Sequence, residues 1–109
     1  MVASSIPLPT IVFDEIDAGV SGEVAIQMGN ILQSLSENHQ LISITHAPQI
    51  AAKAHKHFFV HKVVEKDLSK TALRELDEQE RILEIAKMLS GDHPTEHAQM
   101  NAKELMGIL

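Results

Sequence analysis

The stretch TIVFDEIDAGVSG, residues 10–22, places two adjacent carboxylates at the end of a short apolar run. Thr10 to Phe13 have the composition of a buried strand, which is expected to end at Asp14. Asp14 and Glu15 carry like charges, and carboxylates at the boundary of a core are costly unless they are paired or bound to a metal. The acid pair therefore needs a compensating group, which would be a metal ion, a partner or solvent.

The residues after the acid pair predict a strand–helix–strand unit. Residues 17–22 are a loop by composition, and its glycines, Gly19 and Gly22, permit unusual backbone angles. Ser21 is a plausible N-cap for an amphipathic helix that ends near Asn38. A second apolar strand is expected over Leu41 to Thr45. Two such strands joined by a crossover helix predict a parallel, right-handed βαβ unit and an α/β fold with helices flanking a mostly parallel sheet.

The second half of the chain predicts a short helix, a hairpin and two further helices. Pro48 suits the first turn of a helix that reaches about Ala54. Segments 57–64 and 71–76 are rich in β-forming residues, and the polar turn EKDLS between them indicates a hairpin. Each of the last two helices has a capping residue and one apolar face. The residues concerned are Asp77 and Glu80 (capping box), Ile82, Leu83, Ala86 and Leu89 (face) and Gly91 (stop) in the first helix, and Thr95 (cap), Ala98, Ala102, Leu105 and Leu109 (face) in the second.

Composition limits the possible functions. The chain has 109 residues, which is expected to form a single domain, and a net charge of −6, which argues against binding to a phosphate backbone. Its only aromatic residues are three Phe, too few for a base-stacking surface. The absence of cysteine excludes thiolate metal sites and fits a reducing compartment, and no apolar run is long enough to span a membrane. We expect a soluble cytoplasmic protein.

His46 comes directly after the second predicted strand, in the same way that Asp14 and Glu15 come directly after the first. Ligands of open α/β sheets bind at the carboxyl ends of the strands, so Asp14, Glu15 and His46 are expected to face one cleft. An apolar strand that ends in Asp-Glu has the Walker B pattern of ABC-type nucleotidases, in which a hard cation offsets the repulsion between the acids. Taken alone, the pair would more often be a solvated acidic turn. The order of FDEIDAGVSG and then a strand ending in TH matches Walker B, D-loop and H-loop.

With these motifs the chain resembles the RecN family, bacterial recombinational-repair ATPases related to the SMC proteins. The segments that carry the resemblance extend over nearly the whole chain from Pro9 onward. They are FDEIDAGVSG (13–22), ITHAPQIAA (44–52), HFFVHK (57–62), LDEQERILEIAKMLSG (76–91) and AKELM (102–106). The resemblance implies a function in the repair of DNA double-strand breaks through ATP-driven engagement of two ATPase heads.

The resemblance also implies roles for individual residues. Asp14 would hold Mg²⁺, Glu15 would be the catalytic base, and His46 would sense the γ-phosphate of ATP. Residues Asp17 to Gly22 would form the loop that meets the opposite head across the bound ATP, with Asp17, Gly19, Ser21 and Gly22 as nucleotide-binding positions. Many ABC and SMC proteins have an aspartate where Ser21 stands, so roles proposed for that aspartate do not transfer to this chain.

Two motifs of a complete ATPase head are missing from the sequence. No G-x-x-x-x-G-K-[ST] phosphate loop (Walker A) occurs, and no LSGGE-like signature precedes residue 10. The expectation is therefore that residues 1–109 are the C-terminal part of a head. Such a part should be inactive alone, reach DNA only through its parent protein, and self-associate through surfaces that the rest of the head would cover.

Other readings of the sequence remain open at this point. The chain could belong to another SMC- or ABC-type head, or it could be an interaction module that kept the fold and lost catalysis. His93-Pro-Thr-Glu-His97 matches the H-x-x-E-H pattern of inverted zinc peptidases, although no third ligand stands out. His55, His57 and His61 are a second histidine group, for which adventitious metal binding is the most that the sequence supports. A small metal-dependent hydrolase is thus the alternative from a different class.

Overall fold

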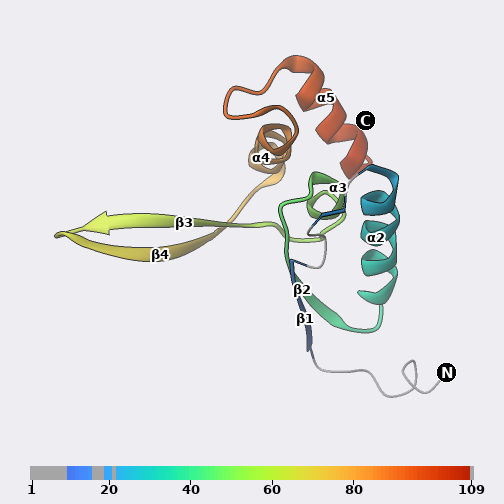
Figure 1. The fold of residues 1–109 in the computed structure, drawn as a ribbon, viewed down its shortest axis with the longest axis horizontal. Helices are drawn as coiled ribbons and strands as arrows, with labels where there is room; N and C mark the ends of the chain where they lie inside the picture. Colours follow the sequence, from blue (N-terminus) through green and yellow to red (C-terminus); the bar gives the residue numbers. More distant parts are fainter. Residues whose placement is uncertain (1–9, 16–18, 21, 109) are drawn as a thin grey trace.

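The structure, a computed structural model, describes residues 10–15, 19, 20 and 22–108. A strand–helix–strand unit is followed by a short helix, a hairpin and two helices (Figure 1). In chain order the elements are β1 (Thr10–Asp14), α2 (Gly22–Leu35), β2 (Gln40–Ile44), α3 (Pro48–Ala51), β3 (Phe58–Glu65), β4 (Leu68–Glu75), α4 (Glu78–Ser90) and α5 (Glu96–Met106). The elements agree with those predicted, and the differences lie at their ends and in the sheets.

The predicted parallel βαβ unit is confirmed. β1 and β2 pair in parallel, with Val12 opposite Ile42 and Asp14 opposite Ile44. The helix α2 ends at Leu35, short of the expected Asn38, because the chain continues in turns that close over three residues rather than four: the Asn38 amide donates to the Leu35 carbonyl at 3.2 Å. The predicted N-cap, Ser21, lies outside the described residues.

The predicted hairpin is confirmed, and it forms a sheet of its own apart from the parallel β1–β2 sheet. β3 and β4 pair antiparallel and project from the rest of the molecule (Figure 1). The connecting turn is also tighter than the predicted five residues. Only Lys66 and Asp67 stand between the strands, with φ of 49° and 62°, and two successive positive φ angles are typical of the two-residue turn that matches strand twist.

The hydrophobic core lies among α3, α4 and α5. The predicted apolar face of α4 included Leu83 and omitted Ile85. In the structure Ile85 is fully buried and Leu83 is 43% exposed, so this part of the prediction is wrong. The helical repeat explains this difference. Residues three and four positions apart share a helix face, so Ile85 lies with Ile82 and Ala86 on the inner face, whereas Leu83 points away from it. The buried members of the core are Ala51, Ala52, Ile82, Ile85, Ala86, Ala98 and Ala102, with Leu89 and Leu105 packed against them. Leu109 lies outside the described residues.

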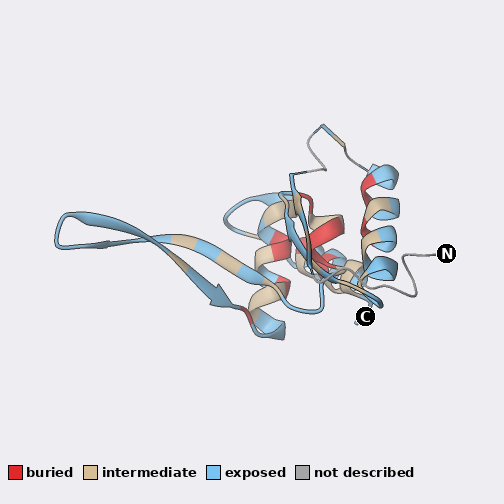
Figure 2. Cartoon of the chain, turned by 90° about the horizontal axis from the view of Figure 1, so that it is seen from below, coloured by how far each residue is buried: buried red, intermediate tan, exposed pale blue. Residues whose placement is uncertain are grey.

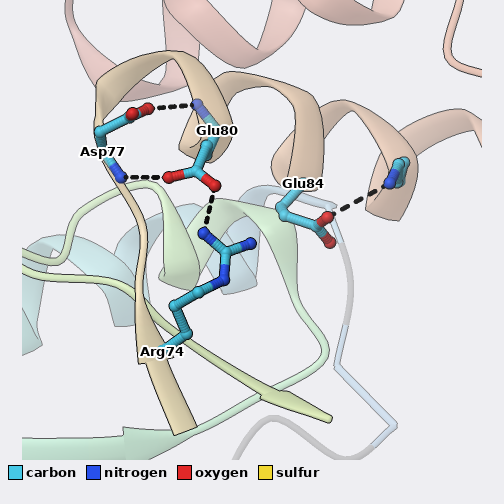
Figure 3. Close-up of polar contacts among 5 residues, drawn as sticks. Arg74, Asp77, Glu80 and Glu84 are labelled. Carbon is cyan, nitrogen blue, oxygen red and sulfur yellow. Dashed lines mark hydrogen bonds and ion pairs between the residues drawn. The ribbon is translucent and has the colours of Figure 1, made fainter.

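The ends of the C-terminal helices follow the sequence closely. In the capping box of α4, the Glu80 amide donates to Asp77 Oδ1 at 2.8 Å, and the Asp77 amide donates to Glu80 Oε1 at 3.1 Å (Figure 3). Arg74 of β4 donates to the same Glu80 carboxylate and ties the hairpin to α4 (Figure 3). The predicted stop at Gly91 and cap at Thr95 are also confirmed.

Candidate functional site

One member of the acid pair, Glu15, meets the histidine at the carboxyl edge of the parallel sheet. Glu15 directly follows β1, His46 follows β2 by two residues, and Glu15 Oε1 lies 3.1 Å from His46 Nε2. Both side chains are open to solvent, with 51% of Glu15 and 89% of His46 exposed. The structure thus brings together two of the predicted site residues from positions 31 apart in the sequence.

The backbone holds Glu15 in an uncommon conformation. Its φ of 52° lies in the left-handed region, which a side chain other than glycine occupies at a cost of roughly 1–2 kcal/mol. The Glu15 amide donates to the Ile44 carbonyl at 2.8 Å, which extends the pairing of β1 with β2 by one residue. Strained backbone concentrates at functional sites, and among the described acids Glu15 shares a positive φ only with Asp67 of the hairpin turn.

The position of His46 is set by its neighbours in the chain rather than by packing of its own ring. The Ala47 amide donates to the Thr45 hydroxyl at 2.9 Å, which closes a local turn around His46. Ala47 is buried, and its carbonyl accepts from the amides of Ile50 and Ala51 at 3.1 and 3.0 Å. The histidine therefore sits on a short turn that continues into α3.

The remaining predicted site residues are placed as far as the structure describes them. Asp14 is exposed at the last position of β1, beside Glu15. Gly19 and Gly22 have φ of 79° and 62°, which confirms that the loop uses backbone angles favoured by glycine. Asp17 and Ser21 lie outside the described residues.

α3 is held in place by residues that the sequence analysis did not single out. A Cβ added to Gly29 of α2 would lie 2.8 Å from the Gln49 carbonyl oxygen, so α2 and α3 are in close contact there. From α4, Arg81 Nη2 donates to the carbonyls of Ala54 at 2.9 Å and Ala51 at 3.4 Å. A glycine inside an apolar helix pattern was a signal for the first contact. Nothing in the sequence distinguishes Arg81 from a surface arginine.

Burial shifts the pKa values of two side chains near α3, Arg81 and His57. Burial lowers the pKa of Arg81 below its ordinary value. The pKa of His57, at the start of the hairpin, is also lowered, first by burial and second by the charge of Arg81. His57 Nδ1 and Arg81 Nε are both buried, with no hydrogen-bond partner among the described residues.

The histidine metal sites that the sequence left open as alternatives are not formed among the described residues. Among the described residues, which include every histidine, no three His, Asp or Glu side chains are grouped so that they could hold a metal. A zinc site at 93–97 or at His55, His57 and His61 is therefore contradicted. Mg²⁺ is commonly held by one or two carboxylates together with phosphate oxygens, so an exposed Asp14 fits that ion without a protein cage.

Comparisons with curated proteins identify relatives over nearly the whole chain. The DNA repair protein RecN of Vibrio cholerae is 38% identical over 97% of this chain. Those of Xylella fastidiosa and Deinococcus radiodurans are 43% and 44% identical over 91% and 90% of it. The chain spans only 19%, 18% and 17% of the length of these three relatives. No family model matches the chain.

A solved structure shares the fold. It comes from work on ATP-driven dimerization and DNA-stimulated activation of SMC ATPases, and it matches 84% of this chain and 55% of its own chain. The TM-score is 0.59 and the sequence identity 20%. In the part of the chain that the structure describes, no helix is long and apolar enough to cross a membrane. The chain is thus similar in sequence to the C-terminal portion of the DNA repair protein RecN, as its motifs predicted, and has the fold of part of an SMC-type ATPase head.

Proposed function

We propose that this chain is the C-terminal part of a RecN-like ATPase head and supplies Walker B and switch residues for ATP hydrolysis in the repair of DNA double-strand breaks. One observation carries the proposal: the Glu15 carboxylate and the His46 ring are in contact, 3.1 Å apart, at the carboxyl edge of the parallel β1–β2 sheet. This edge is where open α/β sheets bind ligands. The similarity to RecN supplies the nature of the ligand.

Glu15 is the proposed general base. Its carboxylate is half exposed and can accept a proton from a water molecule, while its backbone is fixed by the bond to Ile44. His46 contacts the same carboxylate and keeps most of its ring exposed, so it can orient Glu15 and still reach a phosphate oxygen. In this arrangement the base and the phosphate sensor are positioned by each other.

Asp14 is the proposed Mg²⁺ ligand. It stands one residue before Glu15 at the end of β1 and is exposed. When bound, the ion would neutralise charge on the phosphates and offset the repulsion between the adjacent carboxylates. Asp14 would therefore act in nucleotide binding, and Glu15 in the step that breaks the phosphate bond.

The loop after the acid pair is the proposed contact with a second head. Asp17, Gly19, Ser21 and Gly22 would lie across the sandwiched ATP from the other head, as the family resemblance implies. The rest of the parent head would supply the phosphate loop and the signature motif, and DNA would bind elsewhere in the parent, since this chain carries a charge of −6. We place the parent protein in the cytoplasm.

The decisive experiment replaces the proposed base in the longer protein. Glu15→Gln should retain ATP binding and lose about 100-fold or more of hydrolysis, because an amide cannot take up the proton of the attacking water. Glu65→Gln, which removes an exposed carboxylate at the far end of β3, is the matched control and should hydrolyse ATP normally. Hydrolysis by Glu15→Gln within about twofold of wild type, a difference of ~0.4 kcal/mol, would contradict the assignment and favour an interaction module without catalysis.

The chain by itself should neither bind ATP tightly nor hydrolyse it. The amides and lysine of a phosphate loop make most contacts to the nucleotide phosphates, and no such motif occurs in residues 1–109. Calorimetry with ATP and Mg²⁺, together with a phosphate-release assay, tests this. Micromolar affinity with turnover would show that the chain contains a complete nucleotide site.

A further inference from the structure

Arg81 binds the end of α3 from a neighbouring helix. Its Nη2 atom donates to the Ala54 carbonyl at 2.9 Å and to the Ala51 carbonyl at 3.4 Å. These carbonyls lie at and just after the end of α3, where the Ala51 carbonyl also accepts from the Ala54 amide at 3.3 Å. The positions are 27 and 30 residues apart, so the contact is tertiary rather than local. Arg81 therefore fixes α3 relative to α4.

The opposite end of α3 leads directly to His46. Only Ala47 separates His46 from the first residue of α3, and the Ala47 carbonyl accepts the first two amide bonds of that helix. Ile50, Ala51 and Ala52 are buried, and Gly29 of α2 packs against the Gln49 carbonyl on the other side. A displacement of α3 would therefore move the His46 turn with it, because little of the His46 ring is held by contacts of its own.

We propose that Arg81 is a positioning residue for His46: by binding the end of α3 it fixes the place of the histidine beside Glu15. The inference rests on the proposed function, and it adds a residue that lies outside the Walker B, D-loop and H-loop segments. Arg81 touches neither Glu15 nor His46, so it acts only through α3. Misplacement of a reacting group by about 1 Å is enough to lower a rate by up to ~100-fold.

The chain offers a matched control for this arginine. Arg74 lies near the same end of α4 and donates to the Glu80 carboxylate, but its bond ties the hairpin to α4 and does not reach α3 (Figure 3). Replacing either arginine removes one positive charge and one tertiary contact of α4. Only the Arg81 replacement should change the site.

The test compares Arg81→Met, Arg81→Lys and Arg74→Met in the longer RecN-like protein, with two readouts. Hydrogen exchange of residues 45–54 reports on α3 and the His46 turn without any need for activity. Single-turnover hydrolysis and ATP affinity report on the site. Arg81→Met should speed exchange in 45–54 and slow hydrolysis by about tenfold, with ATP affinity within about twofold of wild type. Arg81→Lys, which keeps the positive charge and N–H donors but lacks the planar guanidinium, should be intermediate, and Arg74→Met should match wild type in both.

Combination with His46→Ala decides whether the arginine acts through the histidine. If it does, Arg81→Met should add little further loss of hydrolysis to His46→Ala. Fully multiplied losses, or unchanged exchange and hydrolysis in Arg81→Met, would overturn the inference; Arg81→Lys decides the same points if Arg81→Met does not fold. Normal hydrolysis by His46→Ala would instead refute the proposed role of His46, while the exchange data would still show whether Arg81 holds the turn.

Discussion

The helical end of the molecule and its strands differ sharply in how they are stabilised. α3, α4 and α5 share a core in which Ile85, Ala86 and Ala102 are completely buried. Of the described residues, none in the four strands is buried (Figure 2). Val12, Ile42 and Ile44, on one face of the β1–β2 sheet, are 59%, 48% and 50% exposed.

The proposed site thus lies at the edge of the less protected region. Glu15 and His46 are held by backbone bonds between β1 and β2 and by the link from His46 to α3, and no residue of these two strands is buried among the described residues. On the other face, an open apolar groove lies between Phe13 of β1 and Met28 and Leu32 of α2. In a RecN-like head, segments outside residues 1–109 would cover these surfaces. The helical end contains the hydrophobic core, and the edge of the sheet contains the proposed site.

The strongest test of this contrast is a cavity in the helical core. Ile85→Ala should lower the free energy of unfolding by about 2–5 kcal/mol, because it removes a fully buried side chain from a close-packed site. The matched hairpin variant is Val64→Ala, at a position that is 76% exposed, and its effect should stay within ~0.5 kcal/mol. Urea unfolding followed by circular dichroism measures both. Similar losses would show that the hairpin belongs to the same cooperative core.

A second variant tests the close contact between α2, which follows β1, and α3 of the helical end. Gly29→Ala places a methyl group 2.8 Å from the Gln49 carbonyl oxygen, and such overpacking costs about 1–3 kcal/mol. Alanine gains up to ~1 kcal/mol in helix propensity, so the net effect should be a loss of roughly 1 kcal/mol. Asn30→Ala, at the next, exposed position of α2, gains propensity without a clash and should not destabilise. A stabilised Gly29→Ala variant would mean that α2 and α3 separate easily.

The capping box should contribute less than the core. Asp77→Ala removes the side chain that accepts from the Glu80 amide and should lower the free energy of unfolding by about 0.5–2 kcal/mol. Asp92→Ala, exposed between α4 and α5, is the control and should change it little. An equal effect of the two substitutions in urea unfolding would contradict a specific role for the cap.

Acid should weaken the junction between hairpin and helices. Because burial lowers the pKa of His57 in the folded chain, the unfolded chain binds the proton more readily. The stability that neutral His57 confers is complete above its unfolded pKa of about 6.5 and is lost as the pH falls toward its lower folded pKa. The melting temperature should fall between about pH 7 and pH 5, and less so in His57→Gln than in the control His55→Gln. Identical pH profiles for the two variants would exclude His57 as the cause.

The smallest effect on stability is expected on the bare face of the sheet. Ile42→Thr should change the free energy of unfolding by no more than ~0.5 kcal/mol, because its side chain is half exposed. It should, however, weaken self-association of the isolated chain, which this apolar face favours. Light scattering coupled to size-exclusion chromatography over a tenfold dilution measures the effect. A wild-type chain that is monomeric throughout would show that the exposed apolar face does not drive association.

Local signals predicted most of the elements. The Asp77–Glu80 spacing, Gly91 and Thr95 marked helix ends correctly, because caps depend on neighbours within one turn. The length of the hairpin turn and the buried position of Ile85 were not predicted. Several polar residues flank the turn, so composition did not fix its length. Ile85 follows Ile82 by three positions, so the helical repeat places it on the inner face of α4 and Leu83 outside that face.

The sequence by itself determined which residues stand at the strand ends, since the apolar runs stop at Asp14 and shortly before His46 whatever the rest of the chain does. It also determined the similarity to RecN, because residue identity along nearly the whole chain is a property of the sequence alone. Only the tertiary structure decided that Glu15 and His46 touch, that the hairpin stands apart from the parallel sheet, and that Arg81 holds α3. The Glu15–His46 and Arg81–Ala54 contacts join residues about 30 positions apart. Their geometry depends on strand register and helix packing, which no local pattern of residues encodes.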